Sequence, residues 1–243
     1  MVRSHKPIRH PKFAWLRRHV CPWEFFLAPA GEGPRHRYSN KFVLYSYNDC
    51  HQAPYGYRNQ VLRDWACEAT SSILYYGCQV SARNPRILVL IDIDVQKAGG
   101  LGSTQGARDF ANHLRDTVFP NLYIEPSTHG RGIHGYVVVD CRIDSPHNPT
   151  DRQPNYWAAT VNRQLILLEE RLQQIATEGG FDIEQVEIMG LVNEMSWSNG
   201  RLVEIHKRHA LAKVPAGLVT RFEELRNTTV LTVEALKQLT GPT

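Results

Sequence analysis

The sequence has no hydrophobic run long enough to cross a membrane. Its longest strongly apolar stretch is Ile87–Ile91, whereas a membrane-spanning helix needs about 18 to 20 apolar residues in succession. The basic N-terminal segment is not followed by the apolar stretch that a secretory signal requires. We therefore expect neither a membrane partner nor a secretory route.

Cysteine is also scarce. The chain has five cysteines, and they are widely spaced, at Cys21, Cys50, Cys67, Cys78 and Cys141. An odd number at these spacings favours a reduced, cytoplasmic protein over a disulfide-stabilised one. A zinc site is not expected, because Cys50-His51, Cys67 and Cys78 lack the CxxC spacing of standard zinc sites.

The formal net charge is only +4, but it is unevenly distributed. Residues 1–40 contain eight Lys and Arg and two acidic residues, whereas residues 41–243 contain 20 basic and 22 acidic residues. We expect a basic N-terminal arm with little regular structure over residues 1–38 and one domain over residues 39–243. Such an arm suits contact with a polyanion, and a solvated tail has the same composition.

Hydrophobic periodicity predicts alternating strands and helices. Residues 86–95 are apolar on both faces, as in a central strand, and residues 156–176 carry an apolar stripe at helical spacing. Strands are predicted at 41–47, 86–95, 122–125, 133–140, 185–189 and 201–206, and helices at 59–76, 104–118, 156–176 and 230–239. This order predicts an α/β or α+β fold, with helices packed on a sheet.

Two aspartates end the most apolar strand. Asp92 and Asp94 are two residues apart, so both side chains project from the same face. Like charges at the edge of a buried sheet repel each other and lose hydration, so they need a counter-ion. A divalent metal such as Mg²⁺ or Mn²⁺ supplies it, and salt bridges from nearby Arg or Lys are the alternative.

A polar turn between two predicted strands is the second candidate feature. The sequence Ser127-Thr128-His129-Gly130-Arg131-Gly132-Ile133-His134 combines hydroxyls, an arginine, glycines and imidazoles. Glycines let backbone N–H groups approach an anion closely, and hydroxyls and arginine can bind phosphate oxygens. An ordinary hairpin turn with a packed histidine is the other interpretation.

Together these two features resemble the archaeo-eukaryotic primases, also called primase-polymerases, of the plasmid, phage and bacterial type. The resemblance rests on ILVLIDIDV (Ile87–Val95) and PSTHGRGIHGYVVVD (Pro126–Asp140), and it spans roughly residues 84–215. It implies a primase-type catalytic core, with a mixed sheet, an RRM-like half and helices packed on the sheet.

The resemblance also implies roles for individual residues. Asp92 and Asp94 would be metal ligands, and the nucleotide-binding residues would be Ser127, Thr128, Arg131, His134 and Lys213. An alternative alignment makes Ser127-Thr128-His129 the motif, but His134 opens an alternating strand, as in the family. For the third acidic ligand, Glu187 is favoured by its order along the fold, and Glu204 is the rival.

The implied function is a DNA-dependent nucleotidyltransferase. It would make or extend primers on single-stranded DNA from NTP or dNTP, using two Mg²⁺ or Mn²⁺ ions held by Asp92, Asp94 and Glu187. A helicase or another replication protein is a possible partner. The alternatives are an inactive initiation or single-stranded nucleic-acid-binding protein of this fold, and a metal-dependent nuclease. The nuclease class expects two histidines one residue apart on a strand, which His129 and His134 are not.

Overall fold

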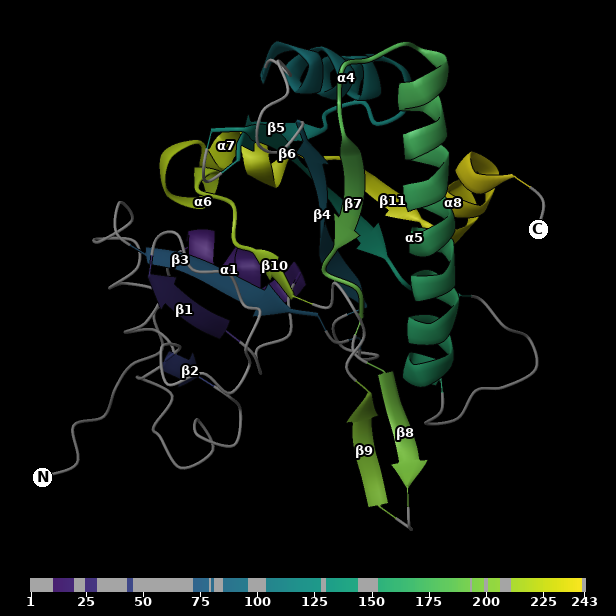
Figure 1. Ribbon diagram of the computed structural model, residues 1–243. Coiled ribbons are helices and arrows are strands. Elements are labelled where there is room, and N and C mark those ends of the chain that lie inside the picture. The colour runs from purple at the N-terminus through teal and green to yellow at the C-terminus, as the bar shows by residue number, and fades with distance from the viewer. Residues whose placement is uncertain are drawn as a thin grey trace, which may run out of the picture.

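The fold combines helices with largely antiparallel sheets. The computed structural model describes residues 11–19, 25–29, 43–45, 72–78, 80, 85–95, 104–127, 130–143, 153–192, 194–198, 201–205 and 211–241. The described strands form three sheets, of five, four and two strands. This arrangement agrees with the α+β class predicted from the sequence (Figure 1).

The largest sheet is built around β4 (Arg86–Asp94). It lies between β6 (Gly132–Asp140) and β7 (Gln185–Met189) and pairs antiparallel with both. On the far side of β6, β5 (Tyr123–Pro126) pairs antiparallel and β11 (Val230–Thr232) pairs parallel. β4 is apolar and buried along most of its length, which explains its central position.

Two helices cover one face of this sheet. α4 (Thr104–Thr117) packs against β6 and β4, and α5 (Gln153–Glu178) runs alongside β7 (Figure 1). Val186 and Ile188 of β7 are buried and alternate with half-buried residues, so they face α5. α8 (Val233–Thr240) packs against α5 and β11.

A second layer of elements lies against the other face. α1 (Pro11–His19) contacts β4 and α6 (Gly217–Thr220), and its Leu16 is fully buried in the core. α7 (Phe222–Arg226) follows α6. The four-stranded sheet has the order β10-β3-β1-β2, and its β10 (Leu211–Lys213) lies beside β4.

The two smaller sheets contain five further strands. In the four-stranded sheet they are β1 (Phe25–Pro29), β2 (Val43–Tyr45) and β3 (Ser72–Gly77). The two-stranded sheet pairs β8 (Glu194–Ser198) with β9 (Arg201–Ile205). Figure 1 shows this hairpin projecting away from the central sheet.

The expectation of little regular structure in residues 1–38 is wrong for two segments. α1 and β1 both fall within this range. β1 pairs with β2 and with β3, so it is an interior strand of its sheet. The region as a whole is highly charged, and its short apolar run Phe25-Phe26-Leu27, which forms the strand, was therefore not predicted.

The helix predicted over residues 59–76 is also wrong at its C-terminal end. Residues 72–77 form β3, and residues 59–71 lie outside the described part of the chain. The Ile73-Leu74-Tyr75-Tyr76 run has the aliphatic and aromatic character that favours a strand once a partner is present. The closing helix starts at Val233, and Thr232 caps it by accepting a hydrogen bond from the Ala235 N–H at 3.1 Å.

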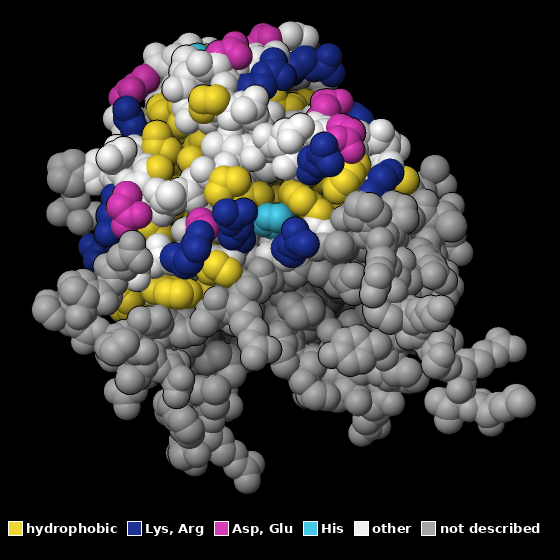
Figure 2. Space-filling model, turned by 180° about the vertical axis from the view of Figure 1, so that it is seen from behind, with side chains coloured by type: hydrophobic (Ala, Val, Ile, Leu, Met, Phe, Trp, Pro, Cys, Tyr) yellow, Lys and Arg dark blue, Asp and Glu magenta, His cyan; other side chains and the backbone are white. Residues whose placement is uncertain are grey.

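A cluster of charged residues lies at the N-terminal end of β4. Asp140 is 8% exposed and receives hydrogen bonds from Arg86 (3.2 Å) and Arg142 (2.5 and 2.8 Å). Seen from behind, the surface shows several Lys and Arg side chains around one histidine, with acidic side chains among them (Figure 2).

No helix within the described residues is both long and apolar enough to cross a membrane.

Candidate metal centre

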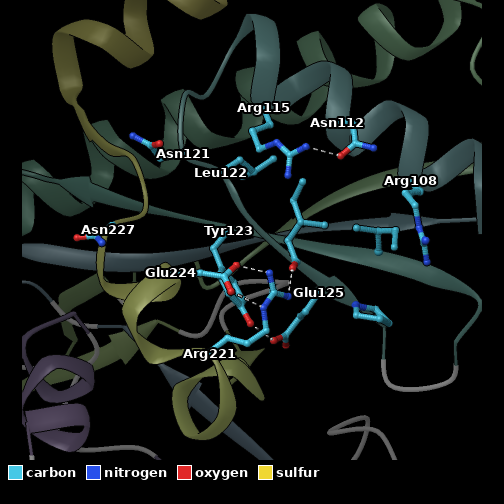
Figure 3. Close-up of a pocket in the computed structure, with 13 residues that line it drawn as sticks. Arg108, Asn112, Arg115, Asn121, Leu122, Tyr123, Glu125, Arg221, Glu224 and Asn227 are labelled. Carbon is cyan, nitrogen blue, oxygen red and sulfur yellow. Dashed lines mark hydrogen bonds and ion pairs between the residues drawn. The ribbon is translucent and has the colours of Figure 1, made fainter.

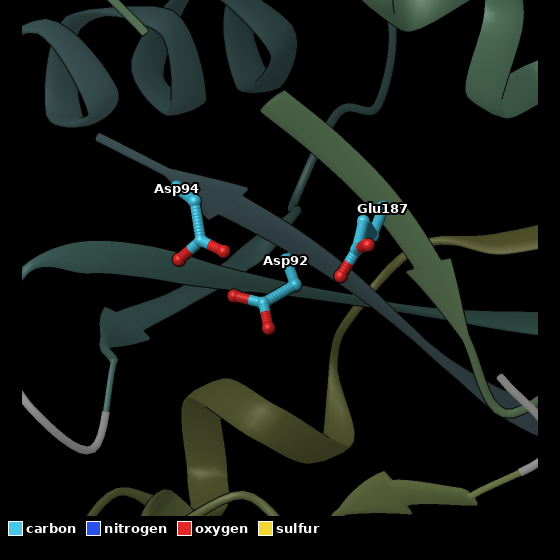
Figure 4. Close-up of side chains that lie close together, drawn as sticks. All are labelled: Asp92, Asp94 and Glu187. Atoms are coloured by element: carbon cyan, nitrogen blue, oxygen red, sulfur yellow. The ribbon is translucent and has the colours of Figure 1, made fainter. Parts of the chain in front are cut away.

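Three carboxylates from two neighbouring strands meet on one face of the central sheet. Asp92 and Asp94 lie on β4, and Glu187 lies on β7 in direct register with Asp92. Each can offer one oxygen such that all three oxygens lie within 4.8 Å of one another. Figure 4 shows the three side chains directed to the same side of the sheet. The cluster follows from strand alternation on β4 and antiparallel pairing with β7.

The cluster has the composition of a cation site. Asp92 is buried, and Asp94 and Glu187 are half-buried. Carboxylates held this close repel one another, and the repulsion is stronger where water is partly excluded. A bound cation removes that repulsion, and carboxylate oxygens are the ligands that hard divalent cations prefer. The three residues can therefore hold a metal ion.

His134 lies beside this cluster, on the same face of the sheet. It sits on β6 in register with Asp92, and its Nε2 is 3.4 Å from Asp92 Oδ1. The imidazole is only 2% exposed and packs edge-on against the Tyr136 ring. In the structure His134 thus contacts a carboxylate of the acidic cluster. Its implied contact with nucleotide phosphate stays a prediction.

Glu187 is positioned by neighbours on β7 and α5. Gln185 Nε2 donates a hydrogen bond to Glu187 Oε1 at 2.7 Å. The outer edge of β7 is held by α5, where Glu169 accepts from the Ile188 N–H (2.7 Å) and Gln173 accepts from the Val186 N–H (2.9 Å). These contacts fix both the strand and the carboxylate that it carries.

The rival residue Glu204 lies on a different sheet. It is part of β9, where it is in register with Met195 of β8. Neither β8 nor β9 pairs with the central sheet among the described residues. The structure therefore places Glu187, and not Glu204, in register with Asp92.

The polar turn lies at the Asp94 end of β4. Ser127 and Gly132 close the turn, with the Ser127 N–H donating to the Gly132 carbonyl (2.9 Å) and the Gly132 N–H to Ser127 Oγ (3.0 Å). Gly132 is in register with Asp94, and a Cβ there would lie 2.4 Å from the Ile93 carbonyl oxygen. Only glycine fits this approach of the turn to the strand.

The remaining predicted nucleotide-binding residues occupy different positions around the centre. Arg131 is exposed in the turn, whereas Thr128 and His129 lie outside the described residues. Lys213 lies on β10, and its backbone carbonyl accepts a hydrogen bond from the Tyr136 hydroxyl at 3.2 Å. Tyr136 is two residues after His134 on β6, so β10 lies on the same side of the sheet as the acidic cluster.

A buried carboxylate that the sequence analysis did not single out adjoins His134. Glu125 on β5 is in register with His134 and accepts hydrogen bonds from the Ala216 and Gly217 N–H groups, both at 3.0 Å. The Tyr123 hydroxyl also donates to it at 3.1 Å. Burial and this carboxylate raise the pKa of Tyr123, which keeps the hydroxyl protonated. In the sequence, the spacing of Tyr123 and Glu125, two residues apart on a predicted strand, was the pattern that could have indicated this carboxylate.

Of the residues considered for a zinc site, Cys78 is the one that lies within the described part of the chain. Cys50, His51 and Cys67 lie outside the described residues. Cys78 is fully buried and its thiol donates to the Leu88 carbonyl at 3.5 Å. Burial raises the pKa of this thiol to about 12, so it stays protonated near neutral pH.

No protein-family model and no curated protein matches the chain. The candidate centre combines three convergent carboxylates, a buried histidine beside them and a glycine-bearing turn at one end.

Proposed function

We propose that the chain is a metal-dependent nucleotidyltransferase of the archaeo-eukaryotic primase type, which makes or extends primers on single-stranded DNA. The observation that supports this most is the convergence of Asp92, Asp94 and Glu187 on one face of the sheet. The turn that carries Ser127 and Arg131 lies at the Asp94 end of the same strand. Nucleotide phosphates would thus lie between the acidic cluster and this polar turn.

The acidic cluster suits Mg²⁺ or Mn²⁺. Its three ligands are carboxylates, and their oxygens are close enough to share an ion. When bound, such ions activate an attacking hydroxyl and neutralise charge on the transferred phosphoryl group. In the proposal, Asp92, Asp94 and Glu187 hold the ions, and single-stranded DNA, NTP and dNTP are the ligands.

The neighbouring residues have positioning roles in this proposal. His134 contacts Asp92 and limits the orientations of its carboxylate, and Gln185 does the same for Glu187. Preorganised side chains lower the free energy needed to reach the reactive geometry. Arg131 is exposed beside the cluster and is available to pair with a nucleotide phosphate.

Primer synthesis by single-site variants tests the proposal. Asp92→Asn, Asp94→Asn and Glu187→Gln each remove one charged metal ligand while keeping its size. We expect each to lower the rate of primer synthesis on single-stranded DNA by more than about 100-fold, since even indirect partners of a metal cost 10–100-fold. The Mn²⁺ affinity of the same variants, measured by calorimetry, is expected to fall in parallel.

The matched control is Glu204→Gln, which lies on β9 outside the central sheet. It is expected to retain synthesis and Mn²⁺ binding. Loss of synthesis in this control with full activity in Glu187→Gln would transfer the third ligand to Glu204. Single-stranded DNA binding by the wild type without any Mg²⁺- or Mn²⁺-dependent synthesis would favour the inactive binding protein instead.

A further inference from the structure

A second polar site lies at the edge of the central sheet, away from the acidic cluster. It is a pocket of about 460 Å³ between α4, β5 and the segment that joins α6 to α7. This volume is within the range of small-molecule sites, about 300–1,000 Å³. Figure 3 shows arginine and asparagine side chains around its opening.

The pocket and the acidic cluster lie on different strands of the sheet. Ile133 lines the pocket and is the residue before His134, so the two side chains point to opposite faces. Ile124 and Pro126 line it as well, and both alternate with Glu125, the register partner of His134. The pocket therefore opens at the β5 edge of the sheet, where Tyr123 and Glu125 also line it, whereas the acidic cluster lies on β4 and β7, with β6 between the two sites.

The positive charge of the pocket is concentrated on α4. Arg108 and Arg115 are seven residues apart, so they lie on one side of the helix, and both line the pocket. Arg108 makes no hydrogen bond or ion pair within the described residues. Arg115 donates to Asn112 at 2.8 Å and is 3.9 Å from the exposed Asp116 carboxylate. Both guanidinium groups remain available to a ligand.

The two glutamates of the pocket are already engaged elsewhere. Glu224 binds Arg221, whose guanidinium also donates to the Ile124 carbonyl and lies 5.1 Å above the Tyr123 ring. Glu125 accepts from two backbone N–H groups and from the Tyr123 hydroxyl. Neither carboxylate neutralises Arg108 or Arg115, so the pocket has an excess of positive charge on the α4 side.

The floor of the pocket is apolar, whereas its rim is polar. Leu122, Ile124 and Ile133 form the floor, and Asn112, Asn121 and Asn227 stand around it with the arginines. Two guanidinium groups can each donate paired hydrogen bonds to the oxygens of a doubly charged phosphate, and amides can bind the edges of a heterocycle. An apolar floor accommodates a flat ring.

We infer that this pocket binds a small nucleoside phosphate, with Arg108 and Arg115 on the phosphate and the base over the apolar floor. The site is distinct from the nucleotide site of the proposed function, because its lining includes none of the three carboxylates Asp92, Asp94 and Glu187. A ligand here contacts both α4 and the α6–α7 segment, and it would hold these two parts of the molecule together.

Calorimetry with adenosine monophosphate in the presence of EDTA tests the inference on the full chain. We expect saturable binding that Arg108→Gln and Arg115→Gln each weaken by about tenfold or more, since each loses a charge-assisted hydrogen bond. Arg163→Gln, at an exposed position on α5, is the matched control and is expected to bind as the wild type does. Thermal unfolding of each variant shows that it is folded.

Three outcomes would overturn the inference. They are no saturable binding, equal binding by wild type and both α4 variants, and equal affinity for inorganic phosphate and adenosine monophosphate. A single-stranded oligonucleotide that binds through Arg108 and Arg115 while the mononucleotide does not would also overturn it. Asp92→Asn is expected to keep the EDTA-resistant binding, so this result and the primer-synthesis result are independent.

Discussion

Asp140 is a nearly buried carboxylate whose charge is stabilised by two arginines. Burial alone would raise its pKa, but hydrogen bonds from the Arg142 side chain and backbone and from Arg86 outweigh burial and lower the pKa below 3.8. The two guanidinium groups are about half exposed, at 44% and 58%, so solvent screens part of the attraction. The pair thus contributes modestly to stability near neutral pH.

The variant Asp140→Asn measures this contribution. We expect it to lower the free energy of unfolding by about 1–2 kcal/mol at neutral pH. Because the folded pKa is depressed, the wild-type stabilisation is present above the unfolded pKa of about 3.9 and is lost as the pH falls through the folded value. Urea unfolding at several pH values is expected to show the difference between the two proteins shrinking below about pH 4.

Asp182→Asn, at an exposed position before β7, is the control for that experiment. It is expected to unfold as the wild type does across the same pH range. A constant difference between Asp140→Asn and wild type down to the lowest pH would show that the carboxylate charge is not what stabilises the fold there.

At this scale the sequence predicted the positions of the two aspartates of β4 better than their surroundings. Alternation along one apolar strand was sufficient to place Asp92 and Asp94 on one face. The register partners of Asp92, which are His134 and Glu187, depend on pairing between strands far apart in the chain. Glu187 could be favoured only by order, and the buried contact of His134 with Asp92 could not be predicted.

α5 holds the edge of the central sheet through side chains instead of another strand. Glu169 and Gln173 are one helical turn apart, and they accept hydrogen bonds from the Ile188 and Val186 N–H groups of β7. An edge strand otherwise leaves these donors unpaired, and both residues are buried. The two side chains therefore fix the strand that carries Glu187.

Glu169→Ala and Gln173→Ala are expected to lower the free energy of unfolding by about 1–3 kcal/mol each, because each leaves a buried N–H without its acceptor. Amide hydrogen exchange of Ile188 and Val186 is expected to become faster, and Mn²⁺ affinity is expected to fall because Glu187 is less well held. Glu169→Gln keeps an acceptor oxygen and is expected to retain most of the stability.

Glu170→Ala removes an exposed carboxylate from the same helix and is the matched control. Unchanged exchange at Ile188 in Glu169→Ala would show that solvent replaces the side chain and that β7 does not depend on α5.

Elements with clear periodicity were predicted well, whereas the shortest ones were not. β7 has the predicted bounds, and α4 differs from its prediction by one residue. The three-residue strand β10 and the short helices α6 and α7 carry too little periodic signal, and tertiary contacts define them. β3 shows the opposite case, in which pairing with β1 overrode an apparent helical pattern.

At the scale of the whole molecule, the basic N-terminal region contributes to the core as well as to the charge. α1 places Leu16 in the core, and Lys12 Nζ donates to the Val219 carbonyl at 2.6 Å. Deleting residues 1–38 therefore removes part of the core and an interior strand along with the positive charge. Charge substitutions ahead of α1 separate these two effects.

A triple variant, Arg3→Gln/Lys6→Gln/Arg9→Gln, tests the charge alone. These residues precede α1 in the sequence and leave Leu16 and Lys12 unchanged. If they contact single-stranded DNA, each neutralised phosphate releases counterions, and the slope of log affinity against log salt is about −0.7 per contact. We expect weaker binding at low salt and a slope that is less steep by up to about 2.

The matched control for this charge effect is Arg163→Gln/Arg171→Gln/Lys237→Gln, which removes the same charge from α5 and α8. Fluorescence anisotropy with a short oligonucleotide at several salt concentrations measures both variants. An equal change of slope in both would mean that DNA responds only to the net charge of the protein. A change confined to the N-terminal variant would assign the polyanion contact to the basic residues that precede α1 in the sequence.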